Sequence, residues 1–127
     1  MMRVYGIGVD VVEIERIEEV LGRHGRRFLE KILTEEERAY CDLQADPLPH
    51  IAARFAAKEA VAKALGTGIG RDLGWLDMEV RRDPRGAPEM FLSGAGAEFA
   101  RQVGIVEVKI SLSHAKTCAV AQAMALA

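Results

Sequence analysis

The chain has 127 residues, of which 50% are hydrophobic and 28% are charged, with a net charge of −2 at pH 7. This length predicts a single domain over residues 1–127, and the composition excludes a disordered chain or a membrane protein. An isoelectric point near 5.9 argues against non-specific nucleic-acid binding. Much of the apolar content is alanine, which buries little area, so we expect a thin core and an oligomer.

Two further features indicate a cytoplasmic protein. Cys41 and Cys118 lie far apart in the sequence and match no metal-binding or redox pair, as is typical of free thiols in a reducing compartment. Asp10 and Glu13 interrupt the apolar run at the N-terminus, so no signal peptide is predicted. No stretch approaches the roughly 18 apolar residues of a membrane-spanning helix.

The first half of the chain predicts one strand and then helices. The β-branched, glycine-containing segment Val4–Val12 predicts a buried strand. Thr34 and Glu37 form a capping-box pattern, and Pro47 and Pro49 mark a break in the helical pattern. The predicted helices run from the end of the strand to about Gly22, over Arg26–Leu33, from Thr34 to about Leu43, and over Ile51–Leu65.

The second half predicts an antiparallel sheet. The segments Trp75–Asp83 and Glu89–Leu92 predict two strands joined by a hairpin turn at residues 83–88, and Ser93 is expected to cap a short helix that stops at Gly104. The segments Val106–Ser113 and Thr117–Leu126 follow and predict two adjacent antiparallel strands. Because helices come mostly early and antiparallel strands mostly late, the fold class is α+β.

The predicted helix Ile51–Leu65 carries charges in an unusual setting. Eleven of its fifteen residues are apolar, and the other four are Arg54, Lys58, Glu59 and Lys63. One interpretation is an ordinary surface pair between Glu59 and Lys63, worth about 0.3–0.5 kcal/mol. The other is a buried helix whose excess of positive charge binds an external anion, since buried charges require partners. The glycine-rich segment 66–70 lets a backbone approach a ligand, although a helix C-cap at Gly66 explains it equally well.

Asp10 also has two interpretations. With Glu13 it fits the N-cap and N3 positions of the first helix, which the local pattern favours. A carboxylate at the end of a buried strand is also a common metal ligand, and Asp10 with Glu59 would supply the one or two carboxylates that Mg²⁺ takes from proteins. Lys63, one turn from Glu59, would then face a phosphate.

The remaining polar residues give weaker signals. His114 follows a strand whose Lys109, Ser111 and Ser113 share one face, and a histidine there is most often just exposed. His24 and His50 have no supporting cluster. A group of arginines between positions 16 and 27 forms either a solvated basic face or a docking surface for an acidic protein.

Three segments together resemble the holo-acyl-carrier-protein synthases, the short class of 4′-phosphopantetheinyl transferases. They are YGIGVDVVEIERI (Tyr5–Ile17), RFAAKEAVAKALGTGIG (Arg54–Gly70) and ISLSHAKTCAVA (Ile110–Ala121). The resemblance covers nearly the whole chain. It implies transfer of the 4′-phosphopantetheine arm of coenzyme A to a serine of apo-acyl carrier protein, with release of adenosine 3′,5′-bisphosphate, as a step in fatty acid biosynthesis. It also implies the phosphopantetheinyl transferase fold, dependence on magnesium, and a homotrimer with active sites at subunit interfaces.

The same resemblance assigns roles to individual residues. Asp10 and Glu59 would bind Mg²⁺, Lys63 would face the pyrophosphate, and Glu59 is the candidate general base with Asp10 as the alternative. The residues expected near the nucleotide of coenzyme A are Arg54, Lys58, Gly66 and His114. Those expected to dock the acidic carrier protein are Arg16, Arg23, Arg26, Arg27 and Phe28.

Two other classes of function compete with this one. A non-catalytic module could bind a nucleotide or coenzyme A without transfer, but it has no need of a metal-binding carboxylate pair. A purely structural oligomer would have no activity that a change at Glu59 could abolish.

Overall fold

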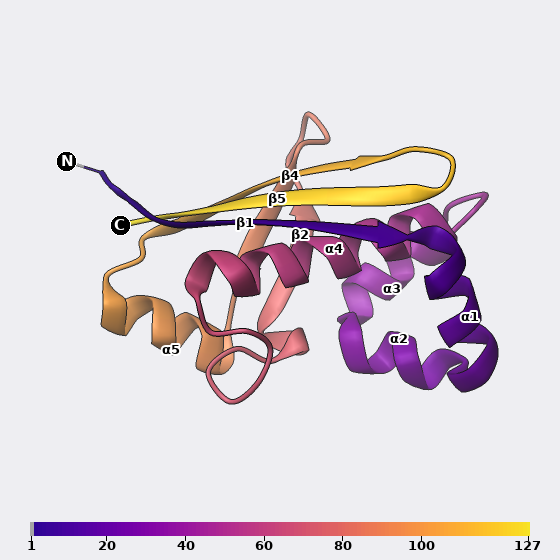
Figure 1. Ribbon diagram of the computed structural model, residues 1–127, viewed down its shortest axis with the longest axis horizontal. Helices are drawn as coiled ribbons and strands as arrows, with labels where there is room; N and C mark the ends of the chain where they lie inside the picture. The colour runs from indigo at the N-terminus through magenta and orange to yellow at the C-terminus, as the bar shows by residue number, and fades with distance from the viewer. Residues whose placement is uncertain (1) are drawn as a thin grey trace.

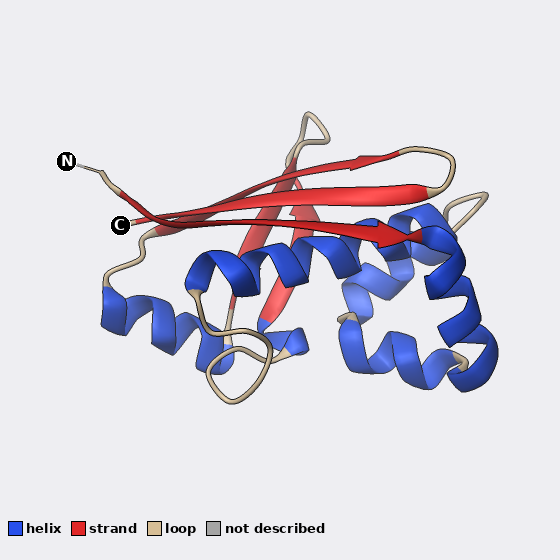
Figure 2. Ribbon diagram, in the orientation of Figure 1, coloured by secondary structure: helices blue, strands red, loops and turns tan. Residues whose placement is uncertain are grey.

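The structure is a computed structural model that describes residues 2–127. It confirms the α+β class: helix α4 crosses one face of an antiparallel sheet, α1 to α3 gather at one end of the molecule, and α5 lies at the other (Figure 1, Figure 2). The elements are β1 (Val4–Glu13), α1 (Ile14–His24), α2 (Arg26–Ile32), α3 (Glu35–Asp42), α4 (Leu48–Leu65), the 3₁₀ turn η1 (Trp75–Asp77), β2 (Met78–Arg82), β3 (Pro88–Leu92), α5 (Gly94–Val103), β4 (Glu107–His114) and β5 (Cys118–Leu126).

The main sheet joins the two ends of the chain. Its strand order is β1-β5-β4 and every pairing is antiparallel, so β1 and β4 are its two edges. The predicted pairing of β4 with β5 is confirmed. The sheet face turned away from α4 exposes apolar side chains of β1: Ile7, Val9 and Val11 are 63%, 56% and 62% exposed.

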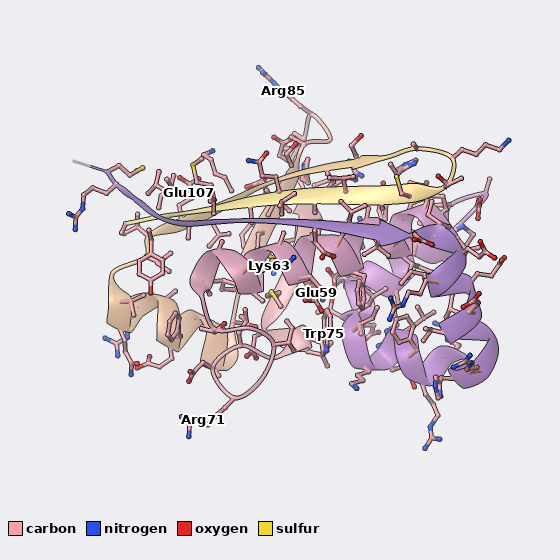
Figure 3. The ribbon with its side chains drawn as sticks, in the orientation of Figure 1. Glu59, Lys63, Arg71, Trp75, Arg85 and Glu107 are labelled. Atoms are coloured by element: carbon pink, nitrogen blue, oxygen red, sulfur yellow. The ribbon has the colours of Figure 1, made fainter. Side chains whose placement is uncertain are left out.

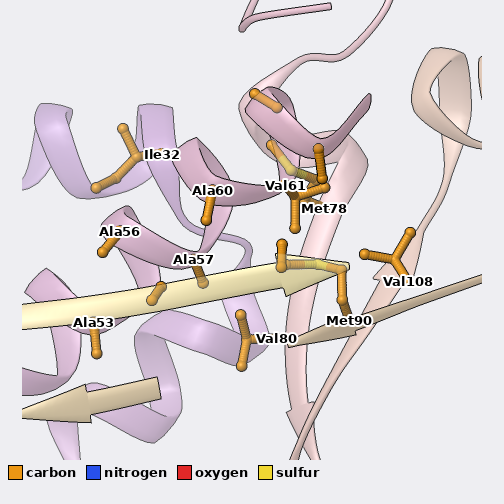
Figure 4. Packing of buried hydrophobic residues seen from close by; sticks show 14 of the residues in the cluster. Ile32, Ala53, Ala56, Ala57, Ala60, Val61, Met78, Val80, Met90 and Val108 are labelled. Carbon is orange, nitrogen blue, oxygen red and sulfur yellow. The ribbon is translucent and has the colours of Figure 1, made fainter. Parts of the chain in front are cut away.

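Helix α4 packs against the sheet almost backbone to backbone. The inward face of β5 consists of buried alanines, and the inward face of β1 carries Gly6 and Gly8. A Cβ atom built on Gly8 would lie 2.0 Å from the carbonyl oxygen of Ala60, and one on Gly6 would lie 2.0 Å from that of Ala64. The alanines of α4 belong to one buried cluster with Val80 and Met90 of the β2–β3 hairpin (Figure 4).

The N-terminal half matches the predicted elements with two corrections. Helix α4 begins at Leu48 rather than Ile51, because Pro49 lies in the first turn, where no helical hydrogen bond needs its N–H. The prediction that Asp10 caps the first helix is wrong, since β1 continues through Glu13 and α1 begins only at Ile14.

The capping box that opens α3 is confirmed. The N–H of Glu37 donates to Thr34 Oγ1 at 3.3 Å, and the N–H of Thr34 donates to Glu37 Oε1 at 2.9 Å. In the second half, the hairpin and α5 are also confirmed, and α5 stops at Gly104 as expected. The first hairpin strand was predicted to begin at Trp75, but Trp75–Asp77 form the 3₁₀ turn η1 and β2 begins only at Met78. Ser93 occupies the N-cap of α5, but its side chain does not cap the helix; Asp77 Oδ2 accepts from the N–H of Gly96 instead, at 3.2 Å.

Cys41 and Cys118 are free thiols, and burial raises the pKa of Cys41 to about 11. No helix within residues 2–127 has the length and apolar character needed to cross a membrane.

The close packing of β1 on α4 predicts a strong response to a single methyl group. Gly8→Ala should lower the stability by about 3 kcal/mol or more, because the new Cβ collides with helix backbone that cannot move aside. Gly22→Ala is the matched control: its added Cβ meets nothing within 4 Å on helix α1, and the change should stabilise the protein by about 0.5–1 kcal/mol. Thermal or denaturant unfolding measures both, and a fully stable Gly8→Ala protein would contradict the packing.

Candidate active site

The approach of β1 to α4 brings Asp10, Glu59 and Lys63 together. Asp10 follows Gly6 and Gly8 at the same two-residue period, so its side chain faces α4. Lys63 Nζ lies 3.3 Å from Asp10 Oδ1 and donates to the carbonyl oxygen of Val9 at 2.9 Å. Figure 3 shows Glu59 and Lys63 along α4, close to β1. Lys63 thus pairs with a residue more than fifty positions away, rather than forming the simple surface pair with Glu59.

Glu59 is held in an unfavourable electrostatic setting. Burial raises the pKa of its carboxyl group, the charge of Asp10 raises it further, and Lys63 opposes both effects. Within residues 2–127 Glu59 accepts no hydrogen bond. Two neighbouring carboxylates with few donors between them form a site that is stabilised by an additional cation.

This oxygen-donor set fits Mg²⁺. Magnesium takes one or two protein carboxylates and completes its shell with water and phosphate oxygens. Within residues 2–127 no group of three or more His, Cys, Asp or Glu side chains could hold a metal by itself, so the protein offers an incomplete shell of this kind.

A groove of about 440 Å³ leads away from the two carboxylates. Its walls come from β1, α1, α2 and α4, and are apolar apart from the acidic end and one arginine. They include Asp10, Arg16, Ile17, Val20, Phe28, Phe55 and Glu59. Phe28 and Phe55 have ring centroids 6.2 Å apart, and Phe55 stacks on Trp75 at 5.1 Å. Arg16 and Phe28, both expected to dock a carrier protein, therefore line the same groove as Glu59.

On another side of α4 lies a second group of residues, the basic cluster, which consists of Tyr40, His50, Arg54, Arg82 and His114. The guanidinium carbon of Arg54 lies 4.2 Å above the Tyr40 ring, and that of Arg82 lies 5.2 Å from it. The His50 ring makes edge contacts with Tyr40 and His114, at 5.9 Å and 5.5 Å between centroids. Arg54 is only 2% exposed, yet its Nε has no hydrogen-bond partner in the described chain.

The basic cluster is electrostatically unbalanced. The pKa of His50 is lowered by burial first and then by the charges of Arg54, His114 and Arg82. An anion bound here would relieve this repulsion and supply an acceptor for Arg54. The sequence predicted no role for His50. The signal that was available is its position one helical turn before Arg54, where His50 contributes its carbonyl oxygen to Arg54 Nη1 at 3.3 Å.

Lys58 is a correction to the sequence analysis. It was expected near coenzyme A, but its side chain is fully buried and its ammonium group donates to Ile32 O at 2.6 Å, Glu37 Oε1 at 2.7 Å and Trp75 O at 3.0 Å. All three N–H groups are thereby used, so none is left for a ligand. The counter-ion of this buried charge is Glu37, within the chain. Burial lowers the pKa of Lys58, and the Glu37 carboxylate opposes that shift.

The other expected site residues are exposed. Gly66 ends α4 with φ of 77° and its N–H donates to Lys63 O at 3.1 Å, so the C-cap role is sufficient to explain this glycine. Its contact with coenzyme A stays a prediction. Three of the arginines expected to dock the carrier protein are exposed on the groove-forming helices: Arg23 on α1, and Arg26 and Arg27 on α2. Arg26 also pairs with Asp42 at 3.5 Å.

The two groups of charges occupy different sides of one chain. At 100° per residue, Arg54 lies about 140° from Glu59 and about 180° from Lys63 around α4. Asp10 lies on β1 and His114 on β4, the opposite edges of the sheet. A single chain therefore presents the carboxylate pair and the basic cluster in different directions.

Comparison with known proteins places this architecture in a family. A sequence profile of the 4′-phosphopantetheinyl transferase superfamily matches residues 6–121. The chain belongs to this superfamily. It is therefore a transferase enzyme.

Individual relatives agree along almost the whole chain. It is 48% identical to the holo-[acyl-carrier-protein] synthase of Chlamydia pneumoniae, with 99% of this chain and 100% of the relative covered. The solved structure of the Neisseria meningitidis synthase matches with a TM-score of 0.92 at 36% identity, covering 97% of this chain and 98% of that one. The Helicobacter pylori synthase in complex with coenzyme A matches with a TM-score of 0.84 at 36% identity, covering 94% and 98%.

The raised pKa of Glu59 predicts that its ionised carboxylate lowers the free energy of unfolding of the metal-free protein. Because the folded pKa is raised above the ordinary value of 4.5, the wild-type protein loses stability as the pH rises from 4.5 through the folded pKa. In a metal-free buffer at pH 7, Glu59→Gln should therefore raise the melting temperature, by about 2 °C. The difference between the two proteins should disappear below pH 4.5.

Glu18→Gln on α1 is the control, since it removes an exposed carboxylate away from Asp10. Calorimetry across this pH range measures all three proteins. A Glu59→Gln melting temperature equal to or below that of the wild type at pH 7 would contradict the assignment.

Proposed function

We propose that this chain is a holo-acyl-carrier-protein synthase. It transfers the 4′-phosphopantetheine group of coenzyme A to a serine of apo-acyl carrier protein, with Mg²⁺ as cofactor, and releases adenosine 3′,5′-bisphosphate. The observation that carries the proposal is the meeting of Asp10, Glu59 and Lys63 at one end of an apolar groove. The names of the relatives support it, and one of the similar structures contains coenzyme A.

The reacting residues have complementary roles. Asp10 and Glu59 would hold Mg²⁺, and the bound ion would supply positive charge that offsets the negative charge of the pyrophosphate. Lys63 has a side chain that is 54% exposed, so its ammonium group is able to turn from Asp10 Oδ1 to a phosphate oxygen on the leaving side. Glu59 is the candidate acceptor for the serine proton, because its carboxylate lines the groove beside Asp10. Asp10 is the alternative base, with Oδ1 already paired to Lys63.

The groove receives the carrier protein. An acidic partner is attracted by Arg16 inside the groove and by the exposed arginines beside it, at positions 23, 26 and 27. Phe28 and Phe55 offer apolar surface to side chains around the serine. This arrangement brings the serine to the carboxylate end, where Glu59 lies.

The basic cluster receives the phosphate-bearing nucleotide end of coenzyme A. Arg54 has a buried Nε without a partner, and His114 is exposed beside His50. A phosphate monoester at the exposed face of the cluster accepts a hydrogen bond from His114, and its charge offsets the mutual repulsion of the cluster, to which the buried guanidinium of Arg54 contributes. Of the four residues expected from the sequence to lie near the nucleotide, Arg54 and His114 therefore remain the best candidates.

A homotrimer unites the two halves of the site. The carboxylate pair lies at the β1 edge of the sheet and the basic cluster at the β4 edge. One coenzyme A molecule reaches both groups when the β1 edge of one chain lies beside the β4 edge of its neighbour. The exposed apolar residues Ile7, Val9 and Val11 form a surface for that assembly. We also propose that the enzyme is cytoplasmic, since its two free thiols fit a reducing compartment. We further propose that it acts in fatty acid biosynthesis, in which acyl chains are attached to the transferred phosphopantetheine arm.

Mass spectrometry of the carrier protein tests the reaction. Incubation with coenzyme A and Mg²⁺ should add ~340 Da to apo-acyl carrier protein, and a chelator should prevent it. Asp10→Asn and Glu59→Gln should each reduce the rate by roughly 100-fold or more, whereas Arg101→Ala, on exposed α5, should be fully active. Binding of coenzyme A without any mass shift would favour the non-catalytic module. Full activity of Asp10→Asn or Glu59→Gln would overturn the metal site.

Mixed oligomers test the shared site. Glu59→Gln removes the carboxylate half, and His114→Glu places a repelling charge in the nucleotide half. Random mixing of these two inactive chains should restore about a quarter of wild-type activity, because that share of interfaces combines two intact halves.

The control is a mixture of Asp10→Asn with Glu59→Gln, which damages the same half twice and should recover nothing. Light scattering should give a mass three times the 13.9 kDa of one chain. Absence of recovery in the first mixture would show that the site lies within one chain.

A further inference from the structure

The Lys58–Glu37 ion pair lies where several packed segments of the chain meet. Both side chains are completely buried, and Nζ lies 2.7 Å from Glu37 Oε1. Lys58 also donates to the carbonyl oxygens of Ile32 and Trp75, while Glu37 Oε2 accepts from the N–H of Val80 at 2.8 Å. One pair thus connects α4 to the end of α2, the start of α3, η1 and β2.

Two of these segments carry the aromatic wall that extends from the groove. Phe28 lies one turn before Ile32 on α2, so the bond from Lys58 to Ile32 O anchors the turn next to Phe28. The bond to Trp75 O anchors the residue whose ring stacks on Phe55. Glu59, the residue after Lys58, stands at the end of the same groove.

Burial of an ion pair is a poor way to gain stability. The desolvation of both charges offsets most of their attraction, and well-packed apolar side chains serve at least as well. An apolar pair, however, offers no donor to the Ile32 and Trp75 carbonyls and no acceptor to the Val80 N–H. Three short bonds from one ammonium group fix the separation of α2, η1 and α4 far more narrowly than apolar packing does.

We propose that Lys58 is a positioning residue for the carrier-protein groove: with Glu37 it fixes Phe28 and Trp75 against Phe55, beside Glu59. This assignment rests on the proposed function, since it takes the groove as the docking site of the carrier protein. Lys58 itself touches no substrate, because its side chain is fully buried.

The test separates groove geometry from folding. Lys58→Met alone leaves Glu37 as an unpaired buried charge and is expected to unfold much of the protein. The double variant Lys58→Met/Glu37→Gln removes both charges and keeps an amide oxygen for the Val80 N–H. With this variant the KM for apo-acyl carrier protein should rise about tenfold, while the KM for coenzyme A and kcat change by less than about threefold.

A second readout needs no substrate. Trp75 is the only tryptophan of the chain, so its fluorescence reports on the aromatic wall alone. In the double variant its emission should shift to longer wavelength and become more accessible to acrylamide. The matched control, Arg101→Met/Glu98→Gln, deletes an exposed ion pair on α5 and should change neither readout.

The outcomes are distinct. A purely structural role for Lys58 predicts a lower amount of active enzyme with both KM values unchanged, and that result overturns the proposal. Unchanged Trp75 emission in the double variant overturns it as well. If the wild-type enzyme fails to modify the carrier protein, the proposed function falls, and the fluorescence of Trp75 still decides whether Lys58 holds the aromatic wall.

Discussion

The whole site depends on how closely α4 lies to the sheet. Only glycine on β1 and alanine on β5 leave enough room, since a single Cβ on Gly8 would lie 2.0 Å from a helix carbonyl oxygen. A larger residue would push the helix outward and carry Glu59 away from Asp10. The alanine-rich composition that predicts a thin core is therefore also what permits two carboxylates from distant segments to meet.

Glu37 and Glu59 differ in how well the fold compensates their negative charges. Glu37 is fully buried and accepts hydrogen bonds from Lys58, from the N–H of Val80 and from its own capping partner, so its charge is satisfied. Glu59 is half-buried, faces Asp10 and has a raised pKa. The first arrangement stabilises the meeting of five segments, and the second leaves unbalanced charge at one end of the groove. Of the adjacent positions 58 and 59 on α4, the first thus carries a satisfied charge and the second an unbalanced one.

The sequence predicts the elements well and the long-range partners poorly. Local patterns locate β1, the capping box at Thr34 and the antiparallel β4–β5 pair, and the family resemblance predicts Asp10 and Glu59 as metal ligands. Local pattern alone favoured a helix cap for Asp10, because nothing nearby reveals that β1 continues through Glu13 beside β5. The partner of Lys58 was also missed, since Glu37 already had a local role in the capping box and its second role depends on tertiary packing. His50 was passed over for the same reason: its neighbours Tyr40 and His114 come from α3 and β4.

The division of charge on α4 links substrate binding to assembly. The carboxylate pair and the basic cluster lie about 140° apart around α4, and in the proposed trimer a ligand with a pyrophosphate at one end of its nucleotide and a phosphate at the other binds the carboxylate pair of one chain and the basic cluster of its neighbour. Where neighbouring chains supply the two halves, each bound ligand adds contacts across an interface. Binding free energy then becomes free energy of assembly, because a ligand that binds only the assembled form shifts the equilibrium towards it. In the proposed trimer, a small subunit with an alanine-rich core would gain from its substrate part of the stability that its own interior does not supply.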